Sequence, residues 1–228
     1  MNSANPTARS HPARWRAIVA GIAAMALVVT ISNVLVQYPL PGQIGPVKLA
    51  DLYTWAAFTY PLSFLVTDLV NRFFGPGAAR KVVYAGFALA VALSMYFANF
   101  RIAVASGSAF LVAQLLDVYV FDRLRRAESW WKPPLASSIL GSLVDTLVFF
   151  SLAFAAIFVF IGPNDDFAIA SAPLLGFLPV EVPRWASWAL GDLMVKLLMA
   201  TVLLAPYGML RAALIRLLGW RENAMPAG

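Results

Sequence analysis

The chain has 228 residues, of which 61% are hydrophobic and only 12% are charged. Soluble domains carry about 25% charged residues, so this composition excludes a large soluble core and favours a polytopic membrane protein. The formal net charge is +6, but the basic residues stand in short clusters between apolar runs, and membrane topology explains them better than nucleic-acid binding. The chain has no cysteine and one histidine, His11, which excludes a thiol nucleophile, a disulfide framework and a Cys/His zinc site.

The apolar runs predict an all-α bundle, because about 20 apolar residues in a helix span the ~30 Å hydrocarbon core of a bilayer. We expect a disordered tail over 1–14, one transmembrane domain over 15–218 and a C-terminal tail over 219–228. The first apolar run follows two arginines, as a signal peptide does, but its length favours a retained helix. The predicted helices are 15–38, 54–74, 82–97, 101–121, 135–161 and 185–206, with an interfacial or cytoplasmic extension over 207–218.

The predicted helix over 54–74 is almost wholly apolar and yet contains Thr67 and Asp68. A carboxylate inside a membrane span costs about 2.5–3.5 kcal/mol by insertion scales, so such a residue usually has a function. Tyr60, Phe64 and Asp68 recur every four residues, which predicts that they share one face of the helix. That face is not expected to contact lipid.

Proline and glycine mark the connections between the predicted helices. Pro61 predicts a bend in the helix over 54–74, and a sharp basic turn is expected over 75–81. The segment over 39–53 contains three prolines and is too broken for a helix. The segment over 162–184, with four prolines and three acidic residues, is the longest predicted loop.

Lys and Arg concentrate on the cytoplasmic side of membrane proteins. Thirteen basic residues fall in the two tails and in the loops after the second and fourth predicted helices, and three fall on the opposite side. This asymmetry predicts six spans with both termini in the cytoplasm. Two sets of three helices then run in opposite directions, which leaves a 3+3 inverted repeat open. The thirteen are Arg9, Arg14, Arg16, Arg72, Arg80, Lys81, Arg123, Arg125, Arg126, Lys132, Arg211, Arg216 and Arg221, and the three are Lys48, Arg101 and Arg184.

Polar and ionisable residues lie at several depths on five of the predicted helices, which predicts a path or cavity through the bundle. From the outer surface inward they are Asn33, Gln37 and Arg101, then Asp192, then Asp145 and Lys196, then Asp68 and Asp117. Simpler structural roles remain open. Asp117 suits an interfacial cap, Asn33 and Gln37 suit hydrogen bonds between helices, and Asp192 and Lys196, four residues apart, suit a self-neutralising pair.

A set of short segments falls in order between about residue 30 and residue 208. They are Ile31-Ser32-Asn33 with Leu35-Val36-Gln37, Trp55 to Phe58, Phe64 to Gly75, Arg101-Ile102-Ala103, Gln114 to Val118, Phe121 to Arg125, Trp130-Trp131, Asp145-Thr146 and Ala189 to Leu197. Taken together, these segments resemble the queuosine precursor transporter family, also called the vitamin uptake transporter family. The stretch before Arg101 is shorter, and the loop over 162–184 is longer, than in the family pattern, and both differences concern the outer entrance.

The resemblance implies a transporter in the bacterial inner membrane that imports 7-cyano-7-deazaguanine and 7-aminomethyl-7-deazaguanine, two precursors of queuosine. A guanine-like edge offers an N–H and an amino group side by side, which one carboxylate accepts in two parallel hydrogen bonds. Amides suit the carbonyl side, and aromatic faces stack on the ring, at about 1–3 kcal/mol by analogy with base stacking. The candidate substrate and transport residues are Asn33, Gln37, Tyr60, Phe64, Thr67, Asp68, Arg101, Gln114, Asp145, Trp188, Asp192 and Lys196.

Two expectations concern the carboxylates among these residues. At least one of Asp68 and Asp145 is expected to accept hydrogen bonds from the guanine-like edge. Asp192 beside Lys196 is a candidate carrier of a coupling proton, because the chain has no Walker motif and secondary transport is then the simplest drive. The expected partners are the bilayer, a deazapurine and a coupling proton or cation, with no cofactor and no nucleic acid; a homo-oligomer remains open.

Other interpretations remain open at this point. A substrate-binding subunit of an energy-coupling vitamin importer has a similar number of helices but needs separate ATPase and coupling subunits. A transporter of another purine-like or vitamin solute is also compatible with the pattern. An intramembrane enzyme is disfavoured: residues 75–80 share a glycine-alanine-arginine element with phosphatidyltransferase signatures, but the paired metal-binding aspartates are absent, and so is a catalytic Cys or His. A purely structural role does not explain five buried ionisable residues.

Overall fold

The computed structural model describes residues 11–125 and 129–217. The helices are α1 (His11–Leu35), α2 (Ala56–Thr59), α3 (Leu62–Phe74), α4 (Pro76–Phe97), α5 (Phe100–Leu124), α6 (Lys132–Phe154), α7 (Asp166–Ile169), α8 (Arg184–Val202) and α9 (Leu204–Leu217). Two antiparallel hairpins pair β1 (Gln43–Ile44) with β2 (Val47–Lys48) and β3 (Ser171–Leu174) with β4 (Leu178–Pro183), and single 3-10 turns cover Leu49–Asp51 and Ala156–Phe158. The prediction of an all-α polytopic membrane protein is confirmed, with short hairpins added to it.

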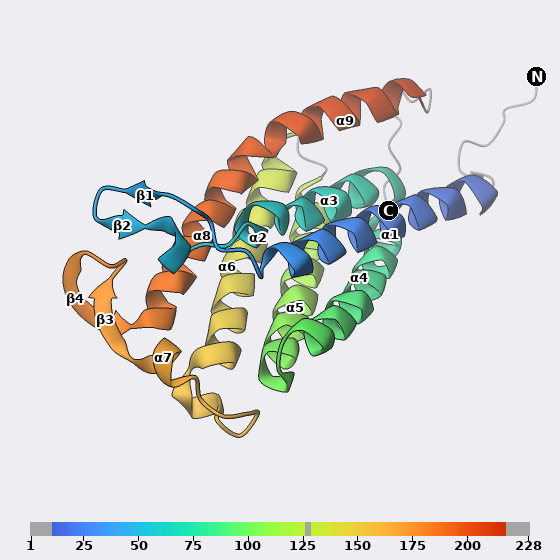
Figure 1. Cartoon of the computed structure of the whole chain (residues 1–228). Coiled ribbons are helices and arrows are strands. Elements are labelled where there is room, and N and C mark those ends of the chain that lie inside the picture. The colour runs from blue at the N-terminus through green and yellow to red at the C-terminus, as the bar shows by residue number, and fades with distance from the viewer. Residues whose placement is uncertain (1–10, 126–128, 218–228) are drawn as a thin grey trace, which may run out of the picture.

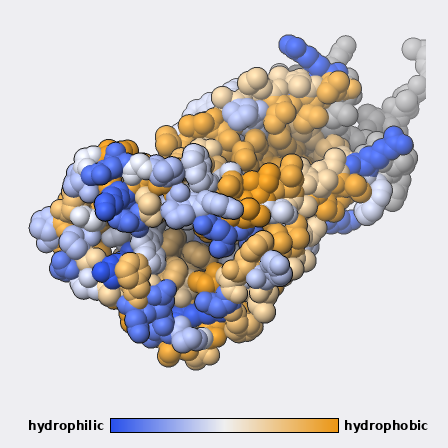
Figure 2. Space-filling model, in the orientation of Figure 1, coloured by the Kyte–Doolittle hydropathy of each residue, from blue (hydrophilic) through white to orange (hydrophobic). Residues whose placement is uncertain are grey.

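Within the described residues, five helical segments are long and apolar enough to cross a membrane. They are Trp15–Leu35, Pro76–Phe97, Phe100–Leu124, Lys132–Phe154 and Arg184–Leu217, the last of which joins α8 and α9. Figure 2 shows an apolar band along the body of the molecule, with hydrophilic residues gathered at its ends. This distribution is that of a protein with its middle in hydrocarbon.

The predicted span over 54–74 is not one of these five, because it is divided into α2 and α3 at Tyr60 and Pro61. Pro61 has no backbone N–H and stands immediately before α3. With 13 residues, α3 is about 20 Å long, shorter than the hydrocarbon core. The α-helix is therefore divided in its hydrogen bonding, although Tyr60 and Pro61 keep right-handed helical backbone angles, and the sixth span remains a prediction.

Other boundaries also differ from those predicted. The basic turn over 75–81 reduces to Gly75, whose φ of +82° suits glycine, because Pro76 already occupies the first turn of α4, where a missing N–H costs nothing. The helix predicted over 135–161 ends at Phe154. Residues 11–14, predicted as disordered, belong to α1, whereas 1–10 and 219–228 lie outside the described residues.

The last helix continues past Pro206 as predicted, but with a break. The helix α8 ends at Val202 and α9 begins at Leu204, so the proline lies in the first turn of α9. Backbone N–H groups in a first turn have no partner within their own helix, which is why proline is tolerated there. Arg211 and Arg216 follow on α9, as the sequence indicated.

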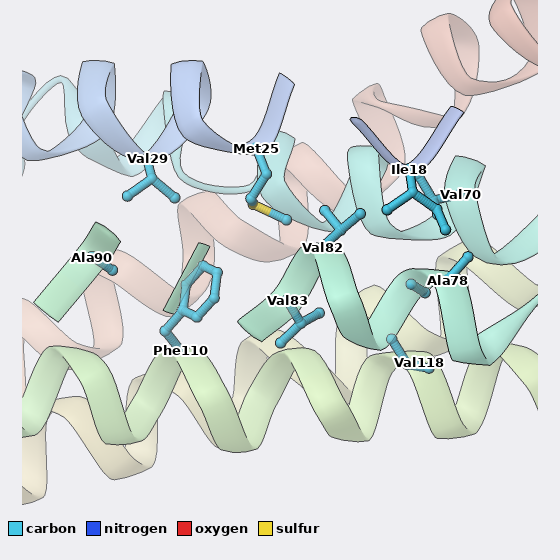
Figure 3. Close-up of a cluster of buried hydrophobic side chains, with 11 residues drawn as sticks. Ile18, Met25, Val29, Val70, Ala78, Val82, Val83, Ala90, Phe110 and Val118 are labelled. Carbon is cyan, nitrogen blue, oxygen red and sulfur yellow. The ribbon is translucent and has the colours of Figure 1, made fainter. Parts of the chain in front are cut away.

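The hydrophobic core lies between α1, α3, α4 and α5 (Figure 3). Small residues bring these helices close together, since a Cβ on Gly21 of α1 would lie 2.9 Å from Val70 and 3.1 Å from Val82. Close approach at glycine is a common way to pack helices in membranes, where lipid provides no hydrophobic force between them. This part of the bundle is the rigid wall against which the other helices are placed.

Both hairpins and α7 gather at one end of the molecule, here called the hairpin end (Figure 1). Arg101 of α5 is buried beneath it, and its guanidinium donates hydrogen bonds of 2.7–3.2 Å to the backbone carbonyls of Leu152, Ala155, Gly162 and Pro163 and to the side chain of Asn164. Arg101 therefore fixes the chain that leaves α6, and all these bonds are structural.

A second buried arginine joins four segments away from the hairpins. Arg72 of α3 donates to the hydroxyl of Tyr207 on α9 and to the backbone carbonyls of Arg125 and Trp130, at 3.1 Å in each case. The ring of Trp130 stacks on Tyr207, with centroids 6.3 Å apart. We call this group, Arg72 with Tyr207 and Trp130, the Arg72 anchor.

Candidate substrate cavity

A cavity of about 790 Å³ opens among α1, α2, α5, α6 and α8 and reaches the loops of the hairpin end. Its volume is within the range of ~300–1,000 Å³ that is usual for small-molecule sites. Its wall is built from segments that are far apart in sequence, including the loop over 50–54 and the hairpin residues 172–176. Seven of the predicted site residues line it: Asn33, Gln37, Tyr60, Asp145, Trp188, Asp192 and Lys196.

Three of these residues form a charged group, which we call the triad: Asp145 of α6 with Asp192 and Lys196 of α8. The Lys196 ammonium donates to Asp145 Oδ2 at 2.6 Å and also to Asp192 Oδ2. Thr146 Oγ1, 3.2 Å from the ammonium, donates to Asp192 Oδ2 at 2.8 Å. The expected pair of Asp192 and Lys196 is thus a three-residue cluster between two helices.

The triad follows from helix geometry and charge. Asp192 is one helical turn before Lys196, so both side chains share a face of α8. A buried ammonium is destabilising unless carboxylates and hydrogen bonds surround it, and Asp145 of α6 supplies the second carboxylate. Two carboxylates and one ammonium leave a formal charge of −1 at the base of the cavity.

Tyr60, which lies at the break between α2 and α3, contacts the triad. Its hydroxyl donates to Asp145 Oδ1 at 3.3 Å, and the Lys196 ammonium lies 5.6 Å from the centre of its ring. The ring also meets Phe110 edge-on, with centroids 6.2 Å apart. Tyr60 thus contacts the triad from the same side of the chain on which Phe64 meets Gly141 of α6.

The two carboxylates of the triad differ in their access to the cavity. The side chain of Asp192 is 20% exposed and that of Asp145 is 5% exposed. Both oxygens of Asp145 accept hydrogen bonds, one from Tyr60 and one from Lys196. Among the described residues, the bonds to Asp192 all go to Oδ2. Oδ1 of Asp192 is therefore the acceptor that remains for a ligand.

Aromatic rings form one wall of the cavity. The ring of Trp188 stacks on Phe167 of α7 at 6.1 Å and meets Phe154 of α6 edge-on at 5.5 Å. Phe149 and Phe150 of α6 also line the cavity. Of these five only Trp188 was predicted, although Phe149 follows Asp145 by four residues and the shared helix face was a usable signal.

Two of the three predicted amides, Asn33 near the end of α1 and Gln37 just after it, line the cavity. Asn33 is partly engaged, because its Nδ2 donates to Val29 O at 3.0 Å and its Oδ1 accepts from Ser94 at 3.3 Å. Gln37 is exposed, and none of the hydrogen bonds among the described residues involves its side chain. Gln37 is therefore the amide available at the mouth of the cavity.

The other five predicted residues lie away from this cavity. Arg101 anchors the chain after α6, as described above. Thr67 donates to Gln114 at 2.6 Å, and Gln114 donates to Ser63 at 2.8 Å, so these side chains link α3 to α5. The expected common face of Tyr60, Phe64 and Asp68 is observed, because the three side chains meet Asp145, Gly141 and Ser137 of α6 in turn, although of the three only Tyr60 lines the large cavity. Phe64 and Asp68 line a separate cavity of about 20 Å³, and Phe64 packs against Gly141 of α6.

The chain matches a protein-family model and several known proteins. A family model described as "Putative vitamin uptake transporter" matches residues 54–100 and 95–210. The chain is 33% identical to the "Queuosine precursor transporter" of Escherichia coli K12 over 224 residues, which covers 88% of this chain and 90% of that protein. It is 32% identical to the "Probable queuosine precursor transporter" of Haemophilus influenzae, with 83% and 84% covered.

A third relative from Bacillus subtilis has the same description as the one from Haemophilus, and is 28% identical over 49% of this chain and 62% of its own length. No solved structure matches the chain. The match to the family model extends over more than half of the residues and includes every element that lines the cavity except α1 and its following loop. The chain therefore belongs to the vitamin uptake transporter family.

Proposed function

We propose that the chain imports the queuosine precursors 7-cyano-7-deazaguanine and 7-aminomethyl-7-deazaguanine across the bacterial inner membrane. Two relatives that each cover more than four fifths of the chain are described as transporters of queuosine precursors. The observation that carries the proposal is the unpaired Oδ1 of Asp192 at the base of a cavity with an aromatic wall. A planar heterocycle with adjacent donors fits such a site.

Recognition of the guanine-like edge is assigned to Asp192. Its Oδ2 is fixed by Lys196 and Thr146, which hold the carboxylate in one orientation. Oδ1 then faces the cavity and accepts from the ring N–H or the adjacent amino group. Asp145, whose oxygens are already bonded, holds Lys196 in place from the other helix.

The ring of the substrate is proposed to stack on the aromatic wall. Trp188 and Phe167 are already nearly parallel, with an angle of 30° between their planes. Stacking of a base on an aromatic side chain contributes about 1–3 kcal/mol and tolerates different substituents at the ring edge. The 7-substituent, nitrile or aminomethyl, then points toward the wider part of the cavity and Gln37.

The formal charge of the triad favours the aminomethyl substrate over the nitrile. A primary aliphatic amine is protonated at neutral pH, as lysine is, so 7-aminomethyl-7-deazaguanine enters with a charge of +1. A cavity with a formal charge of −1 at its base attracts a cation more strongly than a neutral molecule. Both precursors fit the site, and the aminomethyl form is expected to bind more tightly.

The proposed topology has six spans with both termini in the cytoplasm. The helices α2 and α3 together cover Ala56–Phe74, about 28 Å at 1.5 Å per residue, and form the second span as an interrupted helix. The basic asymmetry then places the Arg72 anchor inside and the hairpin end outside, so the cavity opens outward. A reporter fused after Gly228 and one inserted at Asp165 should report opposite sides; the same side for both contradicts this topology.

The proposed driving force is an ion or proton gradient, as in secondary transport. During transport, Asp192 is proposed to exchange its contact with Lys196 for contacts with the substrate. The alternative is a substrate-binding subunit of an energy-coupling importer. Direct binding of labelled precursors to the purified protein tests the recognition step shared by both. A guanine-like analogue without the 2-amino group should compete at least about 10-fold less well, because Asp192 loses a donor. Equal competition by this analogue contradicts the assignment to Asp192.

A further inference from the structure

A second pair of carboxylates is buried on the side of the triad away from the large cavity. Asp68 of α3 is 1% exposed and Asp117 of α5 is 0% exposed. They are adjacent, because hydrogen bonds from Thr67 to Gln114 and from Asn71 to Val118 join the same two helices on either side of them. The hydroxyl of Ser137 on α6 lies 3.3 Å from Asp68 Oδ1 and also 3.3 Å from the carbonyl of Pro134. Three helices thus meet at this pair, which none of the substrate contacts proposed above involves.

The pair lacks hydrogen-bond donors. Among the described residues, no donor bonds to either oxygen of Asp117, and Oδ1 of Asn71, one turn after Asp68, is also buried without a donor. Asn71 uses its Nδ2 for the carbonyl of Val118 at 2.9 Å. Two adjacent buried carboxylates cannot both be ionised, because like charges at this distance repel strongly. One proton shared between them supplies the missing donor.

The charges around the pair agree with one bound proton. Arg72, one turn after Asp68 on the same helix, is a cation that acts on the pair, but three of its N–H groups are used by the anchor. The other titratable groups facing the pair are Tyr207 of α9, which bonds to Arg72, and Lys196 of α8 across a small cavity. Two carboxylates with one proton and one arginine give a formal charge of zero.

The small cavity connects this pair to the triad. Its volume is about 20 Å³, which is enough for one water molecule. Asp68 and Lys196 both line it, together with Ser138 and Ser142 of α6, and their partners on α6, Ser137 and Asp145, are eight residues or about 12 Å apart. Lys196 is the residue of the triad that lines both cavities. A proton route from Lys196 to Asp68 therefore needs the hydroxyls of Ser138 and Ser142 as well as a water molecule.

We propose that Asp68 and Asp117 form the proton-binding site that couples transport, separate from the substrate cavity. This inference rests on the proposed function. The Lys196 ammonium gives a proton toward the small cavity and regains one from water in the large cavity. The proton passes along the Ser142 and Ser138 hydroxyls and bound water and forms an O–H bond on Asp68, shared with Asp117. When the Arg72 anchor opens, that O–H bond breaks and the proton passes to water on the cytoplasmic side. Substrate and proton thus use different carboxylates, and one can be removed without the other.

The test is proton movement by the wild-type protein in liposomes that contain a pH-sensitive dye. The neutral 7-cyano-7-deazaguanine is the probe, because it carries no proton itself. Its entry should acidify the interior, and an inward proton gradient should raise its accumulation at least about fivefold. A gradient of Na⁺ alone should have no effect. Transport without acidification, or accumulation that follows Na⁺, overturns the proton site.

Variants then locate the site. Asp117→Asn places an amide N–H beside Asp68, which replaces the shared proton permanently. It should abolish acidification and gradient-driven accumulation, but exchange of labelled for unlabelled precursor should remain within about threefold of wild type. Asp68→Asn is the second variant and should behave in the same way. Asp122→Asn is the matched control, since Asp122 lies on the same helix as Asp117 but pairs with Arg125 at 2.8 Å.

The outcomes separate this inference from the proposed function. Gradient-driven accumulation by Asp117→Asn and Asp68→Asn at the wild-type level overturns the proton site and leaves the transporter in place. Loss of exchange together with accumulation in both variants also overturns it, because the pair then serves the substrate step. A wild-type protein that neither binds nor carries either precursor overturns the proposed function, and this inference with it.

Discussion

The ammonium of Lys196 lies 2.6 Å from Asp145 Oδ2, although the two residues are 51 positions apart and belong to different helices. This contact joins α6 to α8 at the base of the large cavity. It also explains why two carboxylates are kept in a largely apolar bundle, because each of them stabilises the same buried cation. The predictions below follow from this contact and from the cavity above it.

The first prediction concerns the stability of the triad. Lys196→Met leaves two carboxylates without their cation and should destabilise the protein by about 3–5 kcal/mol. The triple variant Lys196→Met, Asp145→Asn, Asp192→Asn removes all three charges and should melt at a higher temperature than the single variant. Thermal unfolding in detergent measures both. A single variant with the higher Tm shows that the carboxylates do not depend on Lys196.

The second prediction separates the carboxylates by their role. Asp192→Asn loses a charged acceptor for the substrate and should weaken precursor binding about 10- to 100-fold. Asp145→Asn should weaken it as well, because Lys196 then loses a partner and moves. Asp68→Asn should change Kd by less than about threefold, since it lies at the other cavity. Asp51→Asn, another carboxylate that lines the large cavity, is the matched control.

These variants can also be compared in cells. A host unable to make the precursor, supplied with scarce external precursor, should lose queuosine from its tRNA with Asp192→Asn or Asp145→Asn and keep it with Asp51→Asn. Membrane abundance of each variant must be measured alongside, because a misfolded protein has the same effect. Normal queuosine with normal amounts of both variants places recognition elsewhere, most simply at Asn33 and Gln37.

The third prediction concerns the aromatic wall. Phe149→Ala and Trp188→Ala each remove one ring from the cavity and should weaken binding of both precursors by about 5- to 100-fold, the range expected for one stacked base. Phe177→Ala is the control, because that ring is exposed on the turn between β3 and β4 and does not line the cavity. Equal affinities for all three variants contradict stacking on this wall.

The fourth prediction concerns Arg101, which was a candidate transport residue on the sequence evidence. All of its hydrogen bonds go to the chain that leaves α6. Arg101→Lys cannot satisfy five acceptors and should lower Tm by several degrees, while Kd for the precursor in the folded fraction stays within about threefold. A large loss of affinity without a loss of Tm contradicts the structural role.

The sequence predicted the membrane class and most helices, because hydropathy reports directly on burial in lipid. It also singled out Asp145, Asp192 and Lys196 as buried charges. Helical spacing relates residues within one helix and contains no information on which helices are neighbours, so the contact from Lys196 to Asp145 was not predicted. The same limit explains Arg101, which was predicted as a transport residue and is a buried anchor for the chain after α6.

The interruption at Pro61 divides the span that the sequence predicted over 54–74 into α2 and α3. Tyr60, Phe64 and Asp68 keep one common face across the break, since they meet Asp145, Gly141 and Ser137 of α6, but Tyr60 lines the large cavity and the other two line the small one. Sequence alone predicted a bend here, since proline removes one hydrogen bond. Whether a proline bends or ends a helix depends on the packing around it, here the ring of Phe64 against Gly141.

The most direct test of the account is uptake of labelled 7-aminomethyl-7-deazaguanine into liposomes that contain this chain as their only protein. The account predicts saturable uptake without ATP, competed by 7-cyano-7-deazaguanine at higher concentration and abolished at low substrate by Asp192→Asn. Protein that binds the precursor but carries it only after ATPase and coupling subunits are added contradicts secondary transport. Folded protein that does not bind the precursor at all contradicts the assignment of the cavity.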